Sequence, residues 1–423
     1  MDDSTVPLGN QLRGEITPPC SKSYAQRALA AALLASGRTT LRGIELCRDT
    51  RSAIATIERL GAKVEILDND TLVIDGGLKP LADTLNVGES GLAARLFTPI
   101  AALNSTSITI CGEGALLYRP MSMMIEPLKE LGVAVRDGGG RLPIEVCGPM
   151  RGGRVRVDGS MSSQFITGLL IALPLAENDT TIEVEGAVST PYIDMTLDTL
   201  ERFGVEIMYN EGDYTQFYIE GGQKYKPVDY TIESDWSAAA MIMVAAAIAG
   251  EVTVRNLSTL SRQADTAICR ALERAGASLI IEEDRITVAH REIEAFTFDA
   301  THCPDLFPAL VALAAAADGV STISGIKRLH GKESDRGEVL KEEYAKLGIE
   351  IELDYDEDTM RIIGGTPHAA EVDSHDDHRI AMSLAVTALR IDDPISIHNR
   401  ECVAKSYPSF FDDIEMLKQH DGE

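Results

Sequence analysis

The feature that most constrains the fold of this chain is an internal repeat of about seventy residues. Each copy has a short polar cluster, a stretch of mostly apolar residues, a turn containing Gly, Asn or Asp, and a short alternating segment. Six copies follow one another along the 423 residues, beginning at Ser21, Glu89, Ser162, Asp235, Pro304 and Asp376. A fold that satisfies this pattern must use one structural unit six times.

Each copy predicts a buried helix followed by a strand. The apolar stretch is nearly continuous and rich in Ala and Leu, as in SKSYAQRALAAALLAS, which is typical of a buried helix. The Thr, Val and Ile residues that come next alternate with a period of two, which indicates a strand. Further strands (AKVEILDNDTLVIDG, GRVRVDG) and amphipathic helices (MSMMIEPLKELGV, LDTLERFGV) fill the gaps. We therefore expect an α/β protein.

Six units divide most simply into two similar domains of three units each. A chain of 423 residues with 44% hydrophobic content is also long enough to bury two cores. Loop composition places one change of domain near residues 226–233 and the other near residues 17–21. We expect a discontinuous first domain of residues 1–20 and 231–423, and a second domain of residues 21–230. A single large α/β domain is the alternative.

Composition argues against several classes of protein. The longest apolar run, Ser237 to Ala249, is shorter than the roughly 18–20 residues that cross a bilayer, and the acidic N-terminus lacks the apolar core of a secretion signal. The net charge of -27 argues against nucleic-acid and anionic-membrane partners. Seven cysteines without a CxxC pair are typical of reduced thiols. These features predict a soluble, cytoplasmic protein.

The polar clusters lie where the buried helices are expected to begin. Helix N-termini present free backbone N–H groups and the positive end of the helix dipole, so they bind phosphate and carboxylate groups. In the first cluster, Ser23 and Arg27 are four residues apart and share a helix face beside Lys22. The segment GKESDRGEV similarly predicts Lys332 and Arg336 on one helix face. Several such starts converging would form an anion site, whereas each cluster alone could be a solvated helix face.

Other clusters have simpler interpretations. Ser162, Ser163 and Asp305 can be read as helix caps. The run from His375 to His378 could bind a metal, but the other six histidines are scattered and no HExxH or cysteine pair accompanies it. We therefore expect no metal. The chain has no GxxxxGK[ST] loop, no strand-linked GxGxxG and no GxSxG elbow, so kinase, dehydrogenase and serine-hydrolase functions lose their main support.

Taken together and in order, these clusters resemble the enolpyruvyl transferases, and within them the branch that acts on shikimate 3-phosphate. The resemblance extends from SKSYAQRAL near the start to CVAKSYPSFF near the end and includes KESDR and DDHR. It implies two similar domains, each of three repeated units with helices inside and strands outside, known as an inside-out α/β barrel. It also implies an active site in the cleft between the domains.

For shikimate 3-phosphate the resemblance implies a polar cradle. Ser23 and Arg27 would hold the carboxylate, and Tyr192 would pack against the ring. Asp305 would bind the ring hydroxyls and take the proton from the attacking 5-hydroxyl. The residues implied around the phosphate are Ser162, Ser163, Gln164 and Ser189, and Lys22 and Lys332 complete the set.

For phosphoenolpyruvate the resemblance implies a ring of cations, which would stabilise developing charge better than water that must reorganise. The residues are Lys22, Arg119, Arg336, Arg379 and Lys405, with Gly91 and Gln164. In the implied reaction Glu333 protonates the methylene carbon while the 5-hydroxyl attacks the neighbouring carbon, and phosphate then leaves the tetrahedral intermediate. Lys22 and Lys332 would help to transfer protons. No metal or organic cofactor is implied, and the family suggests a monomer.

Two positions depart from the family pattern. At Arg328 the family often has Asn, among other residues, so we assign no role there. Where relatives commonly have Asn-Ala-Gly or Asn-Ser-Gly, this chain has Glu89-Ser90-Gly91. A carboxylate beside an anionic substrate is unfavourable unless a cation pairs with it, so we expect Glu89 to bind Arg119 or Lys22, and we assign it no substrate.

Two alternatives compete with this function. A related transferase acts on UDP-N-acetylglucosamine and usually has a reactive cysteine in a Gly-rich loop ahead of an Arg-Pro. Here, in CGEGALLYRP, Cys111 lies too far back to match. The second alternative is a non-catalytic binding module of the same fold, which only the change at Glu89 favours.

Overall fold

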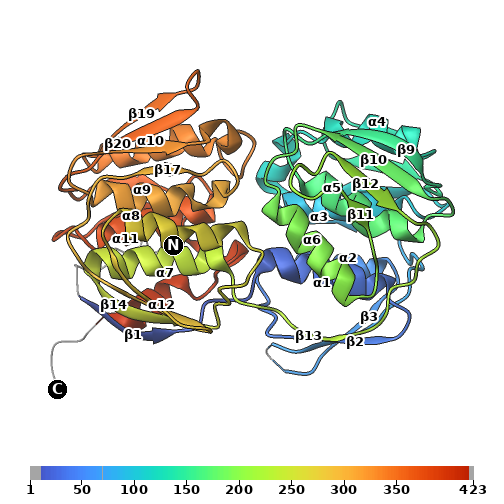
Figure 1. Cartoon of the computed structure of the whole chain (residues 1–423), viewed down its shortest axis with the longest axis horizontal. Helices are drawn as coiled ribbons and strands as arrows, with labels where there is room; N and C mark the ends of the chain where they lie inside the picture. Colours follow the sequence, from blue (N-terminus) through green and yellow to red (C-terminus); the bar gives the residue numbers. More distant parts are fainter. Residues whose placement is uncertain (1–10, 69, 419–423) are drawn as a thin grey trace. The chain divides into compact units, whose positions relative to one another are not determined.

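The computed structural model describes residues 11–68 and 70–418, and the chain divides into two compact units. The first unit joins the residues up to Pro19 with the segment from Ser234, and the second spans Cys20–Glu233. Figure 1 shows that each unit has helices inside and strands outside. The expected α/β class is confirmed. Within the described ranges, no helix combines the length and the apolar character that a membrane span requires.

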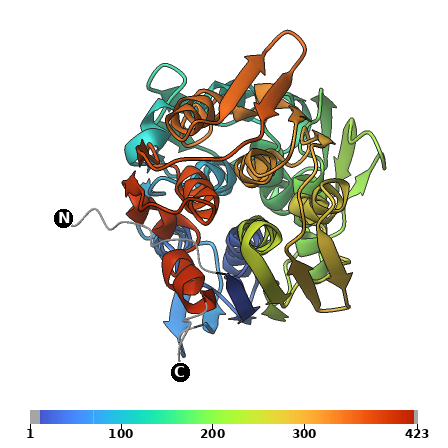
Figure 2. The same ribbon diagram turned by 90° about the vertical axis from the view of Figure 1, so that its left-hand side faces the viewer.

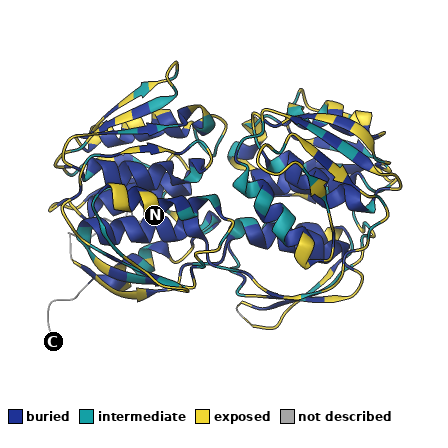
Figure 3. Cartoon of the chain, in the orientation of Figure 1, coloured by how far each residue is buried: buried dark blue, intermediate teal, exposed yellow. Residues whose placement is uncertain are grey.

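One buried helix marks each of the six repeats. These helices are α1 (Lys22–Leu34), α3 (Gly91–Ala101) and α5 (Gln164–Ala172) in the second unit, and α7 (Trp236–Ala249), α9 (Phe307–Ala315) and α11 (His378–Ala388) in the first. Nearly every residue of each is buried, as the dark blue ribbons of Figure 3 show. The buried helices predicted from the repeat are therefore confirmed.

A second set of helices buries only one face. They are α2 (Arg48–Arg59), α4 (Ile125–Glu130), α6 (Pro191–Arg202), α8 (Ile268–Arg274), α10 (Arg336–Lys346) and α12 (Phe410–Leu417). Short 3-10 helices connect several elements: η1 (Gly114–Tyr118), η2 (Ser122–Met124), η3 (Leu173–Leu175), η4 (Ala264–Ala267), η5 (Pro304–Leu306), η6 (Ile326–Leu329) and η7 (Arg400–Lys405). The predicted amphipathic segments lie in η2, α4 and α6, as expected from their 3.6-residue periodicity.

The strands of the described chain repeat one topology. In each four-stranded sheet an outer strand runs parallel to the strand that follows the buried helix, and a hairpin completes the sheet in antiparallel fashion. The second unit has three such sheets: β13 (Asp229–Thr231), β2 (Arg38–Arg42), β4 (Leu72–Asp75) and β3 (Lys63–Ile66); β5 (Thr84–Asn86), β6 (Ile108–Cys111), β8 (Ile144–Cys147) and β7 (Ala134–Asp137); β9 (Gly153–Asp158), β10 (Thr180–Glu185), β12 (Gln216–Ile219) and β11 (Met208–Tyr209).

The first unit has two four-stranded sheets and one strand pair. These are β1 (Leu12–Ile16), β14 (Gly250–Arg255), β16 (Arg285–Ala289) and β15 (Ser278–Ile281); β17 (Thr297–Asp299), β18 (Val320–Ser324), β20 (Thr359–Ile363) and β19 (Glu350–Asp354); and β21 (Glu371–Asp373) with β22 (Ser396–His398). The last repeat thus keeps the parallel pair of the common topology, and the described chain forms no hairpin beside it.

Two outer strands come from outside the repeat that they complete. β1, from the start of the chain, pairs in parallel with β14, and β13, after the third repeat, pairs in parallel with β2. A Cβ atom at Gly250 would lie 2.0 Å from the backbone oxygen of Leu12, so this close pairing requires glycine. Each unit therefore closes its set of repeats with a strand that is distant in sequence.

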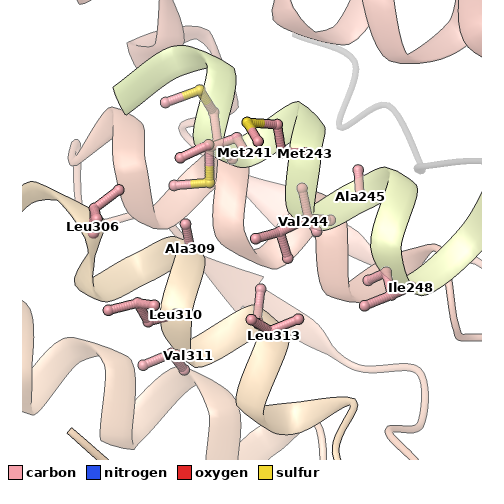
Figure 4. Close-up of a cluster of buried hydrophobic side chains, with 14 of the residues drawn as sticks. Met241, Met243, Val244, Ala245, Ile248, Leu306, Ala309, Leu310, Val311 and Leu313 are labelled. Carbon is pink, nitrogen blue, oxygen red and sulfur yellow. The ribbon is translucent and has the colours of Figure 1, made fainter. Parts of the chain in front are cut away.

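The buried helices pack directly on one another. In the view of Figure 2 the helices of the first unit are seen nearly end-on among their strands. Figure 4 shows Met241 and Val244 of α7 beside Ala309 and Leu313 of α9. In the second unit, a Cβ atom at Gly168 of α5 would lie 2.3 Å from the backbone oxygen of Arg95 in α3. Small residues therefore allow these helices to lie close together, which fixes the positions of their N-termini.

Candidate active site

Capping side chains complete the N-termini of the buried helices. The hydroxyl of Ser21 accepts a hydrogen bond from the backbone N–H of Tyr24 at 3.4 Å, and Ser90 does the same for Ala93 at 3.3 Å. The carboxylate of Asp235 accepts from two backbone N–H groups of α7 at 2.8 and 3.0 Å. These caps hold the candidate site residues in the first turns that follow them.

Seven charged side chains of the first unit form a network that we term the ion-pair cluster. Its members are Asp305, Lys332, Glu333, Arg336, Asp377, Arg379 and Lys405. At its centre the carboxylate of Asp305 lies 3.1 Å from Lys332 Nζ, 3.1 Å from Arg336 Nη1 and 3.3 Å from Arg379 Nη2. Three predicted cations therefore meet at the predicted base.

Arg336 connects the cluster. Its side chain is fully buried, with Nε 2.9 Å from Asp377 Oδ2 and Nη2 2.8 Å from Glu333 Oε2. Burial alone would lower the pKa of Arg336, but the charges of Asp377, Glu333 and Asp305 outweigh it and raise the pKa. Lys405 Nζ lies 3.9 Å from Glu333 Oε1. The arginine is thus held as a cation with a fixed orientation.

The prediction that Lys332 and Arg336 share a helix face is wrong. Helix α10 begins at Arg336, and Lys332 and Glu333 lie in the turn before it, after Gly331 with a left-handed φ of 72°. The acidic and hydroxyl side chains of the Glu-Ser-Asp run compete with the backbone for hydrogen bonds, which favours a turn. Lys332 and Arg336 nevertheless meet, because both bind Asp305.

The pKa values of Asp305 and Lys332 are both lowered, for different reasons. Burial would raise the pKa of Asp305, but Arg379, Lys332 and Arg336 hold it well below its ordinary value. Burial lowers the pKa of Lys332 despite the opposing charge of Asp305. Asp305 is therefore a charged proton acceptor beside a lysine that gives up its proton more readily than usual.

The second unit holds its central cation, Arg27, differently. We term this group the neutral arginine network because the groups that bind the Arg27 guanidinium are uncharged; its residues are Ser23, Arg27, Thr167, Tyr192 and Thr196. Arg27 Nη1 donates to the carbonyl of Ser23 at 2.8 Å, and Nη2 donates to the carbonyl of Tyr192 at 2.9 Å. Its Nε and Nη2 also donate to the hydroxyls of Thr196 and Thr167 at 3.0 and 3.3 Å. Burial lowers the pKa of Arg27 to about 10. The predicted sharing of a helix face by Ser23 and Arg27 is confirmed.

Lys22 is the first residue of α1, and Arg119, which follows η1, extends its guanidinium to the start of α3. Lys22 Nζ is 3.1 Å from the carboxylate of Asp49 at the start of α2. The guanidinium of Arg119 lies directly against Gly91, where an added Cβ atom would be 2.4 Å from Nη1. The substrate-binding roles of these residues stay predictions.

The side chain of Glu89 lies against the turn at Gly114, where an added Cβ atom would be 2.8 Å from Glu89 Cδ. The expected pairing of this carboxylate with a cation stays a prediction.

The predicted phosphate cradle lies at the start of α5 and before α6. The hydroxyl of Ser162 accepts from the backbone N–H of Gln164 at 3.2 Å, but the N-cap residue of α5 is Ser163, whose side chain makes no cap hydrogen bond. Ser163 and Ser189 are buried, and Ser189 has a left-handed φ of 53°. A left-handed conformation is unusual for a residue other than glycine and is often found at binding sites. Tyr192 is half-buried beside them.

Arg95 is a site residue that the sequence analysis missed. It is almost fully buried in α3, with Nη1 2.7 Å from Gln164 Oε1 and Nη2 2.9 Å from the carbonyl of Pro120. It therefore orients the predicted Gln164 side chain. A single cation within the apolar run GLAARLF was the signal that could have indicated it.

The histidine-rich run has a structural role. His375 Nε2 lies 2.9 Å from Glu343 Oε1, and Asp377 both caps α11 and binds Arg336. Glu342, Glu343 and His375 bring potential metal-ligand atoms within 4.8 Å of one another. The ammonium group of Lys346 contacts both oxygens of Glu343 at 2.7 and 2.9 Å and so neutralises that carboxylate.

Comparison with known proteins shows what the chain resembles. The family model described as EPSP synthase (3-phosphoshikimate 1-carboxyvinyltransferase) matches residues 6–414. A 3-phosphoshikimate 1-carboxyvinyltransferase of Methanosarcina acetivorans is 38% identical over 419 residues, covering 96% of each chain, and one of Clostridium perfringens is 35% identical with the same coverage.

Solved structures give the same result. An EPSP synthase structure from Acinetobacter baumannii has a TM-score of 0.83 at 28% identity and covers 98% of each chain. The enolpyruvyl transferase NikO from Streptomyces tendae shares the fold, with a TM-score of 0.78 at 17% identity, covering 98% of this chain and 96% of that one. The inside-out arrangement that the family resemblance implied is thus a fold that the chain shares with these solved structures.

Proposed function

The chain belongs to the EPSP synthase family, and we propose below how its residues carry out the reaction. The protein is a transferase that moves the enolpyruvyl group of phosphoenolpyruvate to shikimate 3-phosphate, a step of the shikimate pathway of aromatic amino-acid biosynthesis. The residue roles that follow, the attack by the 5-hydroxyl and the tetrahedral intermediate are our proposal.

The contact of Asp305 with three cations carries the proposal. A carboxylate whose pKa is held low is a weak base in the free protein, but a substrate anion that binds Arg336 and Arg379 would draw these cations away from it. Asp305 would then accept the proton of the 5-hydroxyl as it attacks, with Lys332 beside it to bind the same oxygen. Substrate binding thereby activates the base.

The cations of the ion-pair cluster would hold phosphoenolpyruvate. In our proposal Arg336 and Arg379 bind its carboxylate, and Lys405, Arg119 and Lys22 bind its phosphate, with Gly91 and Gln164 beside them. Fixed cations stabilise the charge that develops in the addition step without reorganisation. Gly91 supports this role for Arg119, because its missing Cβ leaves room for the guanidinium.

Glu333 would donate the proton to the methylene carbon. Its carboxyl group lies 2.8 Å from Arg336 Nη2 and 3.9 Å from Lys405 Nζ, so it stands beside the cations assigned to phosphoenolpyruvate. Phosphate would then leave from the tetrahedral intermediate, assisted by Lys22, as the methyl group returns one proton to the Glu333 carboxylate and the double bond re-forms.

The cradle of the second unit would hold shikimate 3-phosphate. Ser23 and Arg27 are assigned to its carboxylate, and Tyr192 to its ring. The set assigned to its phosphate is Ser162, Ser163, Gln164 and Ser189. The support is twofold. Among the described residues no carboxylate pairs with the buried Arg27, so its charge attracts an anion, and hydroxyl groups gather at the start of α5. Both units would then act on one pair of substrates.

Phosphate release from phosphoenolpyruvate by the purified protein tests the function. Release should require shikimate 3-phosphate, should not occur with UDP-N-acetylglucosamine, and should fall on the order of 10³-fold in Asp305→Ala. Asp299→Ala, which removes an exposed aspartate of the same unit, is the matched control. A folded protein that releases no phosphate with either acceptor would instead be the non-catalytic binding module.

The remaining expectations concern the surroundings of the protein. We propose a cytoplasmic monomer that takes these two small anions as its partners and needs no cofactor. Sedimentation of the purified protein with and without both substrates tests the monomeric state.

A further inference from the structure

Asp265 in η4 is a buried carboxyl group that the mechanism above does not use. Its side chain is almost fully buried, and its Oδ2 accepts a hydrogen bond from the hydroxyl of Ser237 in the first turn of α7. Among the residues that the structure describes, Oδ1 has no hydrogen-bond partner. An ionised carboxylate left with a bare buried oxygen is costly, so this geometry favours the neutral acid.

The charged groups around Asp265 come from three elements. Asp235 lies with Ser237 at the start of α7, Asp305 lies on η5, and Arg379 lies on α11. The thiol of Cys303, ahead of η5, also faces it. Burial and the charge of Asp305 raise the pKa of Asp265 to about 7, against the opposing effects of Arg379 and of the Ser237 hydrogen bond.

The two neighbouring carboxyl groups, Asp265 and Asp305, thus favour opposite protonation states. Asp305 contacts three cations, whereas Asp265 contacts a hydroxyl. Arg379 is electrostatically shared, because Asp305, Asp235 and Asp265 all raise its pKa against the effect of burial. An ionised Asp265 would therefore compete for Arg379 with any anion that binds there.

Resting on the function proposed above, we propose that Asp265 is a positioning residue that stays a neutral carboxylic acid while phosphoenolpyruvate occupies Arg379. In this state it keeps Arg379 available to the substrate carboxylate and leaves Asp305 as the charged partner of the guanidinium. When Asp265 loses its proton, the added negative charge repels phosphoenolpyruvate. Substrate binding and proton binding at Asp265 are then coupled, each strengthening the other.

The coupling predicts a specific pH profile. In the wild-type protein the KM for phosphoenolpyruvate rises above about pH 7, approaching tenfold per pH unit, while kcat at saturating substrate changes less. Asp265→Asn keeps the shape but cannot ionise, so its KM stays flat over the same range. Ser237→Ala removes the hydrogen bond that favours ionisation, so the rise in KM moves to higher pH. Asp299→Asn is the control and should follow the wild type.

The experiment is a measurement of KM for phosphoenolpyruvate and of kcat from pH 5.5 to 9 for these four proteins. If the Asp265→Asn profile superimposes on the wild type, or if its kcat falls at every pH as in Asp305→Ala, the proposal is wrong. Should Asp265→Asn not fold, the shift in Ser237→Ala decides, and an unshifted profile overturns the proposal. Failure of the proposed function is distinguishable, because the wild type would then show no acceptor-dependent turnover at any pH.

Discussion

Arg336 and Arg27 are both buried arginines, one in each unit, and the groups that contact their guanidinium charges are of opposite kinds. Arg336 contacts the carboxylates of Asp305, Glu333 and Asp377, which raise its pKa against the effect of burial. Arg27 contacts hydroxyls and carbonyls, and burial lowers its pKa to about 10. The charge of Arg336 is therefore neutralised by carboxylates before any substrate binds, whereas the uncharged partners of Arg27 leave a positive charge that an anion can neutralise.

This difference suggests a division of work between the units. In the proposed function, an anion that binds to the ion-pair cluster would displace internal carboxylates, and that exchange would activate Asp305 as a base. An anion that binds to the neutral arginine network would displace no carboxylate, so this network would supply affinity for shikimate 3-phosphate directly. Chemistry and acceptor binding are thereby assigned to different electrostatic environments.

The largest expected effect is on folding, in Arg336→Met. Removing the cation takes the arginine partner from the fully buried carboxylate of Asp377 and one cation each from Asp305 and Glu333, so we expect the first unit to lose about 3–5 kcal/mol of stability. Trp236, the one tryptophan in the sequence, lies in this unit, so its fluorescence during urea unfolding reports on the first unit. Arg361→Met, which breaks an exposed pair with Glu352, should cost less than about 1 kcal/mol. Equal losses in the two variants would contradict the compensation described for Arg336.

Arg27→Met should have a smaller effect on folding. The change leaves hydroxyls and carbonyls unsatisfied but no buried charge, so the expected loss is about 1–3 kcal/mol. Circular dichroism should detect it, whereas Trp236 fluorescence should not, and the KM for shikimate 3-phosphate should rise at least about tenfold. Arg38→Met, at an exposed pair with Asp75 in the same unit, is the control. A loss as large as that of Arg336→Met would remove the distinction between the two networks.

Gly91 and Gly337, in the first turns of α3 and α10, allow substrate binding to be compared between the two units. A Cβ atom at Gly91 would lie 2.4 Å from Arg119 Nη1, whereas a Cβ atom at Gly337 would lie 3.5 Å from the nearest neighbouring atom, Tyr355 Oη. Gly91→Ala should displace the guanidinium and raise the KM for phosphoenolpyruvate by several-fold, with the fold intact because that side chain can move. Gly337→Ala should leave KM unchanged and add up to about 1 kcal/mol of stability. Equal KM values in both variants would show that Arg119 does not need the space at Gly91.

The sequence predicted the repeated architecture well because buried helices and their polar starts are local patterns. Helices α1 and α7 begin one residue after the polar Ser21 and Asp235, which cap them. The pairing of β1 with β14 and of β13 with β2 has no local signal, since it joins segments distant in sequence. The turn at Lys332 was mistaken for helix because its spacing alone cannot show that the side chains bind Asp305 rather than lie along one helix face.

Only part of the candidate site could be predicted from the sequence, because contacts between distant side chains leave no local pattern. Asp305, Arg336 and Arg379 stand in recognisable motifs, and the structure brings them together. Arg95 and Asp265 lie within or beside apolar segments, and their partners are visible only after folding. Sequence motifs therefore do not identify residues that act by contacting other side chains. An isolated charged residue in an apolar run nevertheless indicates a candidate for such a role.

The smallest expected effect, the pH dependence of folding in Asp265→Asn, tests the two carboxyl groups of the first unit against each other. The unfolded-state pKa of an aspartate is about 3.9. Because the folded pKa of Asp265 is raised to about 7, its contribution is fully favourable below about pH 4 and is lost as pH rises toward 7. Asp305 has a depressed folded pKa, so its contribution has the opposite sign: it is present above about pH 4 and is lost as pH falls.

Urea unfolding monitored by Trp236 fluorescence between pH 4.5 and 8 separates these contributions. Relative to its own stability at pH 4.5, Asp265→Asn should lose less stability than the wild type by pH 8, by at least about 1.4 kcal/mol, the equivalent of one pKa unit. Above pH 8 the difference should level off, because Asp265 is then ionised in both folded and unfolded protein. Parallel curves for the two proteins would mean that Asp265 is already ionised in the folded state at pH 4.5, and that Arg379 is shared by two charged carboxylates even before substrate arrives.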